Sequence, residues 1–421
     1  MKKGITSKFK KNDYLLNVIS KVSTMFIGFL SSMFSARYLG VVNKGIYNYI
    51  SKISGIGVIV GNMGLYQSYS FNYKKLGKNT LKKYSDLFFL QFLIYLAISV
   101  AAVFFIKNRN IVLAALLIPF DVLKRQYENV VLIENMRLRM FLHVFNQILL
   151  TVSYAALFFF ADSNVVYIIV LTIFVDAFTV GFYLVKLRYL PKIWQADFRF
   201  LKEIIGFGFI PMISLLLTTI NYSIDVFFLK GLGTPEELGY YSFAVTIIHY
   251  VWMLPDAFKE VLFSKSAKKF DKENIKLSTQ ISLLSMVCCL VGFTVFGKFL
   301  TRLVYGAEYL PSYGVVLVLI IGAFPMALFK LLGVVLVSQG KRGIHLITLA
   351  ISAAINIVLN ILTIPQWGMY GAAWASVASY TVCGTVLTVY FCKLFDFRIT
   401  ELLIPSPKTV KSILSKLRKK S

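Results

Sequence analysis

Five cationic side chains lie inside long apolar stretches of this sequence, where a charge is costly unless it faces water or a partner. They are Lys21, Lys52, Lys124, Arg125 and Lys330. Ammonium and guanidinium groups at low dielectric bind phosphate strongly, and several of them can share one diphosphate. Their depth therefore predicts a hydrated cavity that takes an anionic cargo. The amides of Asn62 and Asn356 are further candidate binding groups.

Four carboxylates within the same kind of stretch are candidates for binding a coupling proton or cation: Asp121, Glu128, Asp176 and Asp225. The spacing leaves a second interpretation open. Asp121–Arg125 and Lys124–Glu128 are each four residues apart on one expected helix, so each pair can neutralise itself locally. Pairing and binding do not exclude each other.

Structural roles compete with binding at several of these positions. Lys21 is close enough to the end of its stretch for its ammonium to reach the interface. Asp225 lies near the outer end of its stretch, where it can be solvated or cap a neighbour. Asn356 and Asn360 can hold helices together, which is the commoner role of Asn in membranes.

Motifs for catalysis are absent from the sequence, which has no P-loop, GxSxG or HExxH. The four cysteines lie in apolar stretches with no His or carboxylate at ligand spacing, so we interpret them as packing residues. We therefore expect no enzyme activity, metal or cofactor. Without an ATP site, uphill transport would draw on an ion gradient, the membrane potential or cargo supply.

The elements that carry these residues are predicted to be membrane-spanning helices. Of the 421 residues, 57% are hydrophobic and 15% are charged, against roughly 25% charged in soluble domains. A helix of about 20 apolar residues crosses a bilayer, and the sequence contains about twelve such stretches. Their limits are 14–38, 45–71, 83–106, 111–133, 140–161, 164–186, 203–229, 238–262, 276–300, 312–338, 343–364 and 368–393.

Lysine and arginine are concentrated in every second gap between these stretches. The alternate gaps hold only Arg37, Lys44, Lys107, Arg109, Lys230, Lys298 and Arg302. Because basic loops stay in the cytoplasm, this pattern predicts an even number of spans with both termini cytoplasmic. We assign the net charge of +26 to orientation and to contacts with anionic lipid headgroups, and not to nucleic acid.

The two halves of the sequence repeat each other. Leu39-Gly40 is followed by Gly45-Ile-Tyr, and Leu232-Gly233 by Gly239-Tyr-Tyr; Pro119 precedes Lys124 as Pro325 precedes Lys330. Six spans per half give the halves the same orientation, related by an axis along the membrane normal. We therefore expect an all-α integral membrane protein with a six-helix lobe at 1–190, a second at 191–400 and a basic cytoplasmic tail at 401–421.

Motifs in both halves resemble one family. Residues 225–244 are similar to the junction of spans seven and eight in polysaccharide flippases, and Asn356-Ile-Val-Leu-Asn360 is followed by Pro365, Gly368 and Gly371. The first half adds Ala36-Arg-Tyr-Leu-Gly40. Together these resemble the Wzx-type O-antigen and capsule flippases of the multidrug/oligosaccharidyl-lipid/polysaccharide (MOP) exporter superfamily, over nearly the whole chain.

The resemblance implies a V-shaped fold of two lobes, as in multidrug and toxin extruders, that opens alternately to either side of the bacterial inner membrane. It implies a cargo of undecaprenyl-diphosphate-linked oligosaccharide, an O-antigen or capsule repeat unit for lipopolysaccharide or polysaccharide biosynthesis. The cationic residues would hold the diphosphate and acidic sugars. The resemblance also leaves open a polysaccharide polymerase or a chain-length protein as a partner. Two alternatives remain, a cation-coupled small-molecule exporter and, more remotely, a membrane-bound glycan polymerase or acyltransferase.

Overall fold

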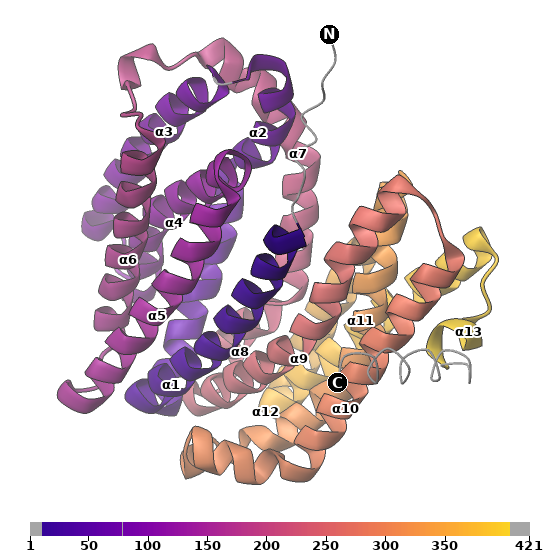
Figure 1. The fold of residues 1–421 in the computed structure, drawn as a ribbon. Coiled ribbons are helices and arrows are strands. Elements are labelled where there is room, and N and C mark those ends of the chain that lie inside the picture. Colours follow the sequence, from indigo (N-terminus) through magenta and orange to yellow (C-terminus); the bar gives the residue numbers. More distant parts are fainter. Residues whose placement is uncertain (1–10, 78, 405–421) are drawn as a thin grey trace. The chain divides into compact units, whose positions relative to one another are not determined.

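The computed structural model describes the backbone of residues 11–77 and 79–404, and their side chains except at 11–22, 74, 264 and 268. Every regular element in this part of the chain is helical (Figure 1). The long helices are α1 Lys11–Asn62, α2 Leu65–Leu76, α3 Asn79–Phe105, α4 Arg109–Glu134, α5 Met136–Phe160, α6 Val165–Leu187, α7 Phe198–Asn221, α8 Ile224–Leu232, α9 Pro235–Lys268, α10 Lys272–Val304, α11 Ser312–Ser338 and α12 Arg342–Phe395. Two 3-10 turns, Ile193–Gln195 and Ala307–Tyr309, and a short α13, Ile399–Leu403, complete the set.

Eight helices among the described residues are long and apolar enough to cross a membrane: α1, α3, α5, α6, α7, α10, α11 and α12. Two of them are double, because α1 and α12 each bend at a glycine with positive φ, Gly40 (67°) and Gly368 (54°). α4 and α9 are of comparable length, with 26 and 34 residues, but more polar. If α2 and α8 are taken as continuations of the preceding helices, the described chain holds twelve long helical segments, as the sequence predicts.

The bend of α12 is tied to the start of α9 by one carboxylate. Thr234 and Glu237 form a capping box, in which Glu237 accepts a hydrogen bond from the Thr234 N–H at 3.0 Å. The other oxygen of Glu237 accepts from the N–H of Met369 at 3.2 Å. A Cβ at Gly368 would lie 1.7 Å from that oxygen, and the positive φ of 54° is one that other residues rarely adopt, so the bend favours glycine.

The chain divides into two compact units, Met1–Thr219 and Ile220–Ser421. The division falls inside α7, later than the boundary at residue 190 that the sequence suggests. Aromatic contacts explain this, because Phe207 of α7 stacks on Phe71 of α2 with the ring centroids 4.2 Å apart. In addition, Gly208 meets Gly64 so closely that a Cβ on either would fall within 2.3 Å of the other's carbonyl oxygen.

Within the first unit, α3, α4, α5 and α6 run alongside one another (Figure 1). Its core includes Tyr84, whose ring meets those of Tyr69, Phe88 and Phe200 at centroid distances of 5.0, 5.5 and 5.3 Å. Pairs of this kind each contribute about 0.5–1.5 kcal/mol beyond area burial. This cluster fastens the start of α7, which carries Phe200, to α2 and α3.

Asp197 caps the first turn of α7. Its carboxylate accepts hydrogen bonds from the N–H groups of Phe200 at 3.0 Å and Arg199 at 3.1 Å, and pairs with Lys83 at 3.2 Å. The N–H of Phe200 is the largest cause, with Lys83 next, of a lowered Asp197 pKa. The cap therefore keeps its charge, which suits the positive end of a helix.

Within the second unit, α11 is packed between α9 and α12. Small residues permit this close approach, because Gly384 of α12 lies so near Pro325 of α11 that a Cβ would sit 2.1 Å from the proline carbonyl oxygen. Trp252 of α9 donates its indole N–H to the carbonyl of Ala323 at 3.1 Å. The first residues of the expected tail pack against the protein, since Leu402 is buried. Residues 405–421 of the tail lie outside the described part.

Candidate functional site

A cavity of about 350 Å³ lies between α2, α4, α5 and α6 of the first unit. α4 contributes five polar side chains to its wall: Asp121, Lys124, Arg125, Glu128 and Asn129. α5 contributes His143, Asn146 and Gln147, and α2 contributes Tyr66. The α4 residues converge because positions i, i+3, i+4 and i+7 of a helix share one face. The volume is at the lower end of the roughly 300–1,000 Å³ of small-ligand sites.

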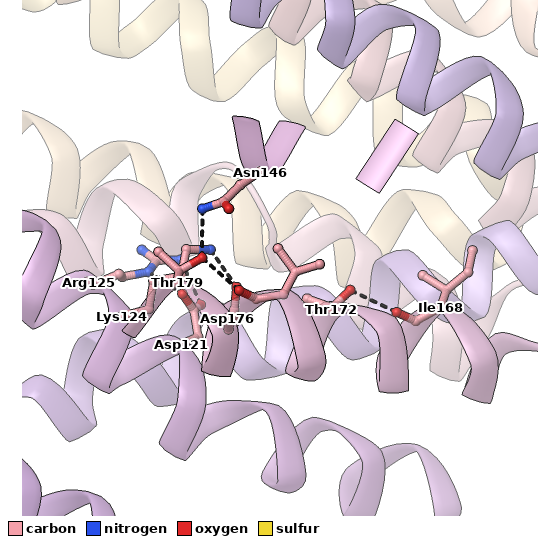
Figure 2. Close-up of polar contacts among 9 residues, drawn as sticks. Asp121, Lys124, Arg125, Asn146, Ile168, Thr172, Asp176 and Thr179 are labelled. Atoms are coloured by element: carbon pink, nitrogen blue, oxygen red, sulfur yellow. Dashed lines mark hydrogen bonds and ion pairs between the residues drawn. The ribbon is translucent and has the colours of Figure 1, made fainter. Parts of the chain in front are cut away.

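Both cations of the wall are held by carboxylates (Figure 2). The Lys124 ammonium lies 2.7 Å from a carboxylate oxygen of Asp176 on α6. Arg125 donates to both oxygens of Asp121 on its own helix, at 2.9 and 3.0 Å. One of the two pairs expected four residues apart therefore forms, Asp121–Arg125, whereas Lys124 pairs across the helices and not with Glu128.

A second polar contact fixes α5 to α6 beside these pairs. The Asn146 amide donates to the hydroxyl of Thr179 at 2.7 Å, and Thr179 donates to the carbonyl of Val175 at 2.6 Å. Figure 2 shows Thr179 and Asp176 on the same face of α6, toward Lys124. The wall is thus crosslinked by hydrogen bonds from three helices, which keeps its charged groups in place.

Among the side chains that the structure describes, the balance of charge at this cavity is not cationic. Lys124 and Arg125 face three carboxylates, those of Asp121, Asp176 and Glu128. Spare donors remain, because an ammonium has three N–H groups and a guanidinium five, and the pairs use one and two of them. The side chains of Glu128 and Gln147 have no hydrogen-bond or ion-pair partner among the described residues.

Of the remaining first-half candidates, Asn62 and Lys52 do not line this wall. Asn62 is buried and accepts a hydrogen bond from the N–H of Tyr66 at 3.4 Å, so it supports the start of α2. Lys52 is half-buried on α1 and does not line this cavity. Lys21 belongs to α1, but its side chain lies outside the described residues.

The contribution of α5 to this wall was not predicted from the sequence. His143, Asn146 and Gln147 have spacings of three and four residues, which place them on one helical face. That signal was present in the sequence. The contribution of Tyr66 has no such signal, because its position depends on the break between α1 and α2 at Met63 and Gly64.

A buried polar cluster in the second unit surrounds Asp225 of α8. Its carboxylate accepts hydrogen bonds from the hydroxyls of Tyr241 and Ser376, the latter at 2.8 Å, and from the Asn356 amide at 3.4 Å. Asp225 is 1% exposed and Asn356 is fully buried. Of the interpretations left open for Asp225, solvation at the outer end of its span does not hold, because side chains of α9 and α12 enclose the carboxylate.

The same cluster continues along α12 and α7. Asn360 donates to the side-chain oxygen of Asn356 at 2.6 Å, and Asn356 also donates to the carbonyl of Asn221 at 3.2 Å. Ser379 donates to the side chain of Asn221 at 2.9 Å and contacts Ser352 at 2.7 Å. Asn356 thus joins helices, as the structural interpretation of the sequence allowed, and also contacts the candidate coupling residue.

Lys330 lies beside a second carboxylate in this unit. Its ammonium is 2.9 Å from Asp256 of α9, which also pairs with Lys259 at 2.9 Å. The same ammonium lies 4.7 Å from the ring centroid of Trp252 and 5.5 Å from that of Tyr222. Cation–π contacts of this kind favour a charged ammonium at low dielectric. Two cations and one carboxylate give this cluster a net positive charge.

Two solved structures of transporters share the fold of this chain. The chain matches the lipid II flippase MurJ in an inward closed conformation with a TM-score of 0.64 at 15% identity, covering 92% of this chain and 88% of that one. It matches an inward-facing multidrug resistance MATE family transporter of the MOP superfamily with a TM-score of 0.63 at 12% identity, covering 90% and 98%. The fold is therefore the all-helical, multi-pass membrane fold of the MOP superfamily.

Sequence comparison gives the family. A family model described as a polysaccharide biosynthesis protein matches residues 34–314, and the chain belongs to that family. A curated relative, the probable low-salt glycan biosynthesis flippase Agl15 of Haloferax volcanii, is 24% identical over 169 residues, which are 38% of this chain. The match spans about a third of that relative, 36% of its length. These relatives are named as flippases and transporters and not as enzymes.

Proposed function

We propose that this protein is a flippase that moves a lipid-linked glycan across the bacterial inner membrane. The observation that carries the proposal is the first-unit cavity, where two cations and three carboxylates meet between membrane-spanning helices. Charges at such a depth are costly, so they mark a cargo or ion pathway. The family, the glycan flippase Agl15 and the lipid II flippase MurJ support a glycan headgroup as the cargo.

The cargo is an undecaprenyl-diphosphate-linked oligosaccharide, such as an O-antigen or capsule repeat unit. Its headgroup passes through the polar interior by alternating access, while the polyprenyl tail stays in the bilayer. Lys124 and Arg125 contact the headgroup with their spare donors. Lys330, with Lys259 beside it, is the best placed of the remaining candidates for a diphosphate, because the cluster is net positive. Lys21, Lys52, Asn62 and Asn356 complete the proposed set.

An ion gradient drives the cycle in this proposal. Asp225 is the leading coupling residue, because hydroxyl and amide groups surround its carboxylate and could be replaced by a bound cation or a proton. Asp176, Asp121 and Glu128 are the first-unit candidates, since each lies at the cavity wall or in contact with it. Both termini lie in the cytoplasm, anionic lipids contact the basic loops, and a polysaccharide polymerase is a candidate partner.

A gene-deletion strain tests the function. Removal of the gene should abolish surface glycan and cause the lipid-linked precursor to accumulate, as measured by mass spectrometry. Lys330→Ala and Lys52→Ala should restore less than a tenth of the glycan at wild-type protein levels. Lys269→Ala, an exposed loop position, is the matched control and should restore it fully. Full surface glycan in the deletion strain would overturn the proposal, and full rescue by both variants would overturn the roles of Lys52 and Lys330.

A second candidate function is export of cationic small molecules. The excess of carboxylates over cations at the first-unit cavity favours it, and so does the likeness to a multidrug transporter. A drug-susceptibility panel on the deletion strain separates the two functions. Increased susceptibility to cationic drugs with normal surface glycan would favour export.

A further inference from the structure

We infer that the first-unit cavity binds a neutral sugar of the cargo and does not bind its diphosphate, an inference that depends on the proposed function. Charge is the first reason. A diphosphate needs a net positive site, whereas Lys124 and Arg125 here are already paired with Asp176 and Asp121. Glu128 adds a third carboxylate. An acidic ligand would be repelled at this wall.

Unused hydrogen-bonding groups are the second reason. Glu128 offers two acceptor oxygens and Gln147 offers an acceptor and two donors, and neither side chain has a partner among the described residues. Asn129 donates its amide N–H to the carbonyl of Arg125 at 2.8 Å, which leaves its side-chain oxygen as a fourth acceptor oxygen. Sugar hydroxyls both donate and accept, so a mixture of this kind suits a pyranose better than an acceptor-only phosphate.

The remaining wall and the volume agree with this ligand. Tyr66 lines the cavity, and an aromatic side chain can pack against the C–H groups of a sugar. Lys124 and Arg125 keep N–H donors for ring or hydroxyl oxygens. A cavity of about 350 Å³ has room for one monosaccharide. Glu128 and Gln147 are then the specificity-determining residues, and they recognise a sugar that has no carboxylate.

The test is saturation-transfer difference NMR on the full-length protein in lipid nanodiscs. The probes are neutral hexoses and N-acetylhexosamines, glucuronate, and inorganic pyrophosphate as a competitor. At least one neutral sugar should give a signal that glucuronate does not, and equimolar pyrophosphate should not displace it. Glu128→Gln and Gln147→Ala should each lower the signal at least fivefold. Glu308→Gln, an exposed position of the second unit, should leave it unchanged.

Three results would overturn the inference: no signal from any neutral sugar, an unchanged signal in both variants, or displacement by pyrophosphate. If one variant fails to fold, as judged by its thermal unfolding, the other variant and the comparison of sugars in the wild type still decide. The deletion strain separates this inference from the function. If deletion abolishes surface glycan but Glu128→Gln and Gln147→Ala both restore it fully, the sugar site is wrong and the flippase proposal stands.

Discussion

At the scale of single residues, the ion pair of Lys124 and Asp176 dominates the first-unit cavity. The Asp176 side chain is 4% exposed and that of Lys124 is 24% exposed. A carboxylate so deeply buried needs its counter-charge, because removing one partner of a buried pair leaves an uncompensated charge at low dielectric. The pair therefore supports the wall of the cavity.

Lys124→Ala should cost more stability than Asp176→Ala, because it leaves the more buried charge alone. We expect a loss of about 3 kcal/mol for Lys124→Ala and a coupling energy of about 1–3 kcal/mol in the double-mutant cycle. SDS-titrated unfolding in mixed micelles measures both. The exposed pair Lys83–Asp197 is the control and should couple much more weakly than the buried pair, because solvent screens it. Equal coupling energies in the two pairs would contradict the assignment of Lys124 and Asp176 as a buried, strongly coupled ion pair.

Asn356→Ala tests whether this residue serves structure, transport or both. The substitution removes the amide that donates hydrogen bonds to the Asp225 carboxylate and to the carbonyl of Asn221. The loss of these bonds should destabilise the second unit by about 1–3 kcal/mol. If Asn356 also serves transport, surface glycan per folded protein should fall as well. Asn274→Ala, at an exposed position, is the control. Loss of stability with full transport per folded molecule would leave Asn356 with a structural role alone.

At the scale of elements, the contact of Gly64 with Gly208 decides where α7 packs. Gly64 has a φ of 74° at the break between α1 and α2, and the backbone of α7 approaches it at Gly208. Only the absence of both Cβ atoms permits this approach. The contact helps to bind most of α7 to the first unit, although the charge and span pattern counted α7 as the first helix of the second lobe.

Gly208→Ala should push α7 away from the break, because its Cβ would lie 2.1 Å from the Gly64 carbonyl oxygen. We expect a loss of about 1–3 kcal/mol, typical of overpacking. Gly206→Ala is the matched control two residues earlier, since nothing lies within 4 Å of its Cβ. It should stabilise the helix by about 0.5–1 kcal/mol. SDS-titrated unfolding gives the stability of both variants. A Gly208→Ala protein as stable as the wild type would disprove the close contact.

At the scale of the whole molecule, the distribution of lysine and arginine predicts the orientation. Alkaline phosphatase fused after Asp162, between α5 and α6, should be active because the charge pattern predicts that this gap lies outside the cytoplasm. Fusions after Lys192 and after Asp271 should be inactive, since both gaps are basic. The reverse pattern would invert the proposed direction of transport. Fusion protein levels on immunoblots are the control.

Much of the helical plan could be predicted from the sequence. The limits of α11 agree with the predicted stretch 312–338, and the predicted twelve segments are present in the described chain. Local hydrophobic length determines these elements, because each backbone group in a bilayer must be satisfied within its own helix. The joins were less predictable. The backbone leaves the helical conformation at Gly40 and Gly368, close to where the predicted spans of each pair meet. The breaks that separate α2 from α1 and α8 from α7 lie inside predicted spans, and hydropathy does not register them.

The site divides in the same way. The sequence by itself determined which charges are deep, since apolar length and charge position are properties of the chain, and it placed Asp121 four residues from Arg125. Only the tertiary structure decided that Lys124 pairs with Asp176, which is 52 residues away, and that α5 and α2 complete the wall. Partner choice between helices depends on how each helix rotates and packs against its neighbours, and no local pattern in a sequence encodes that geometry.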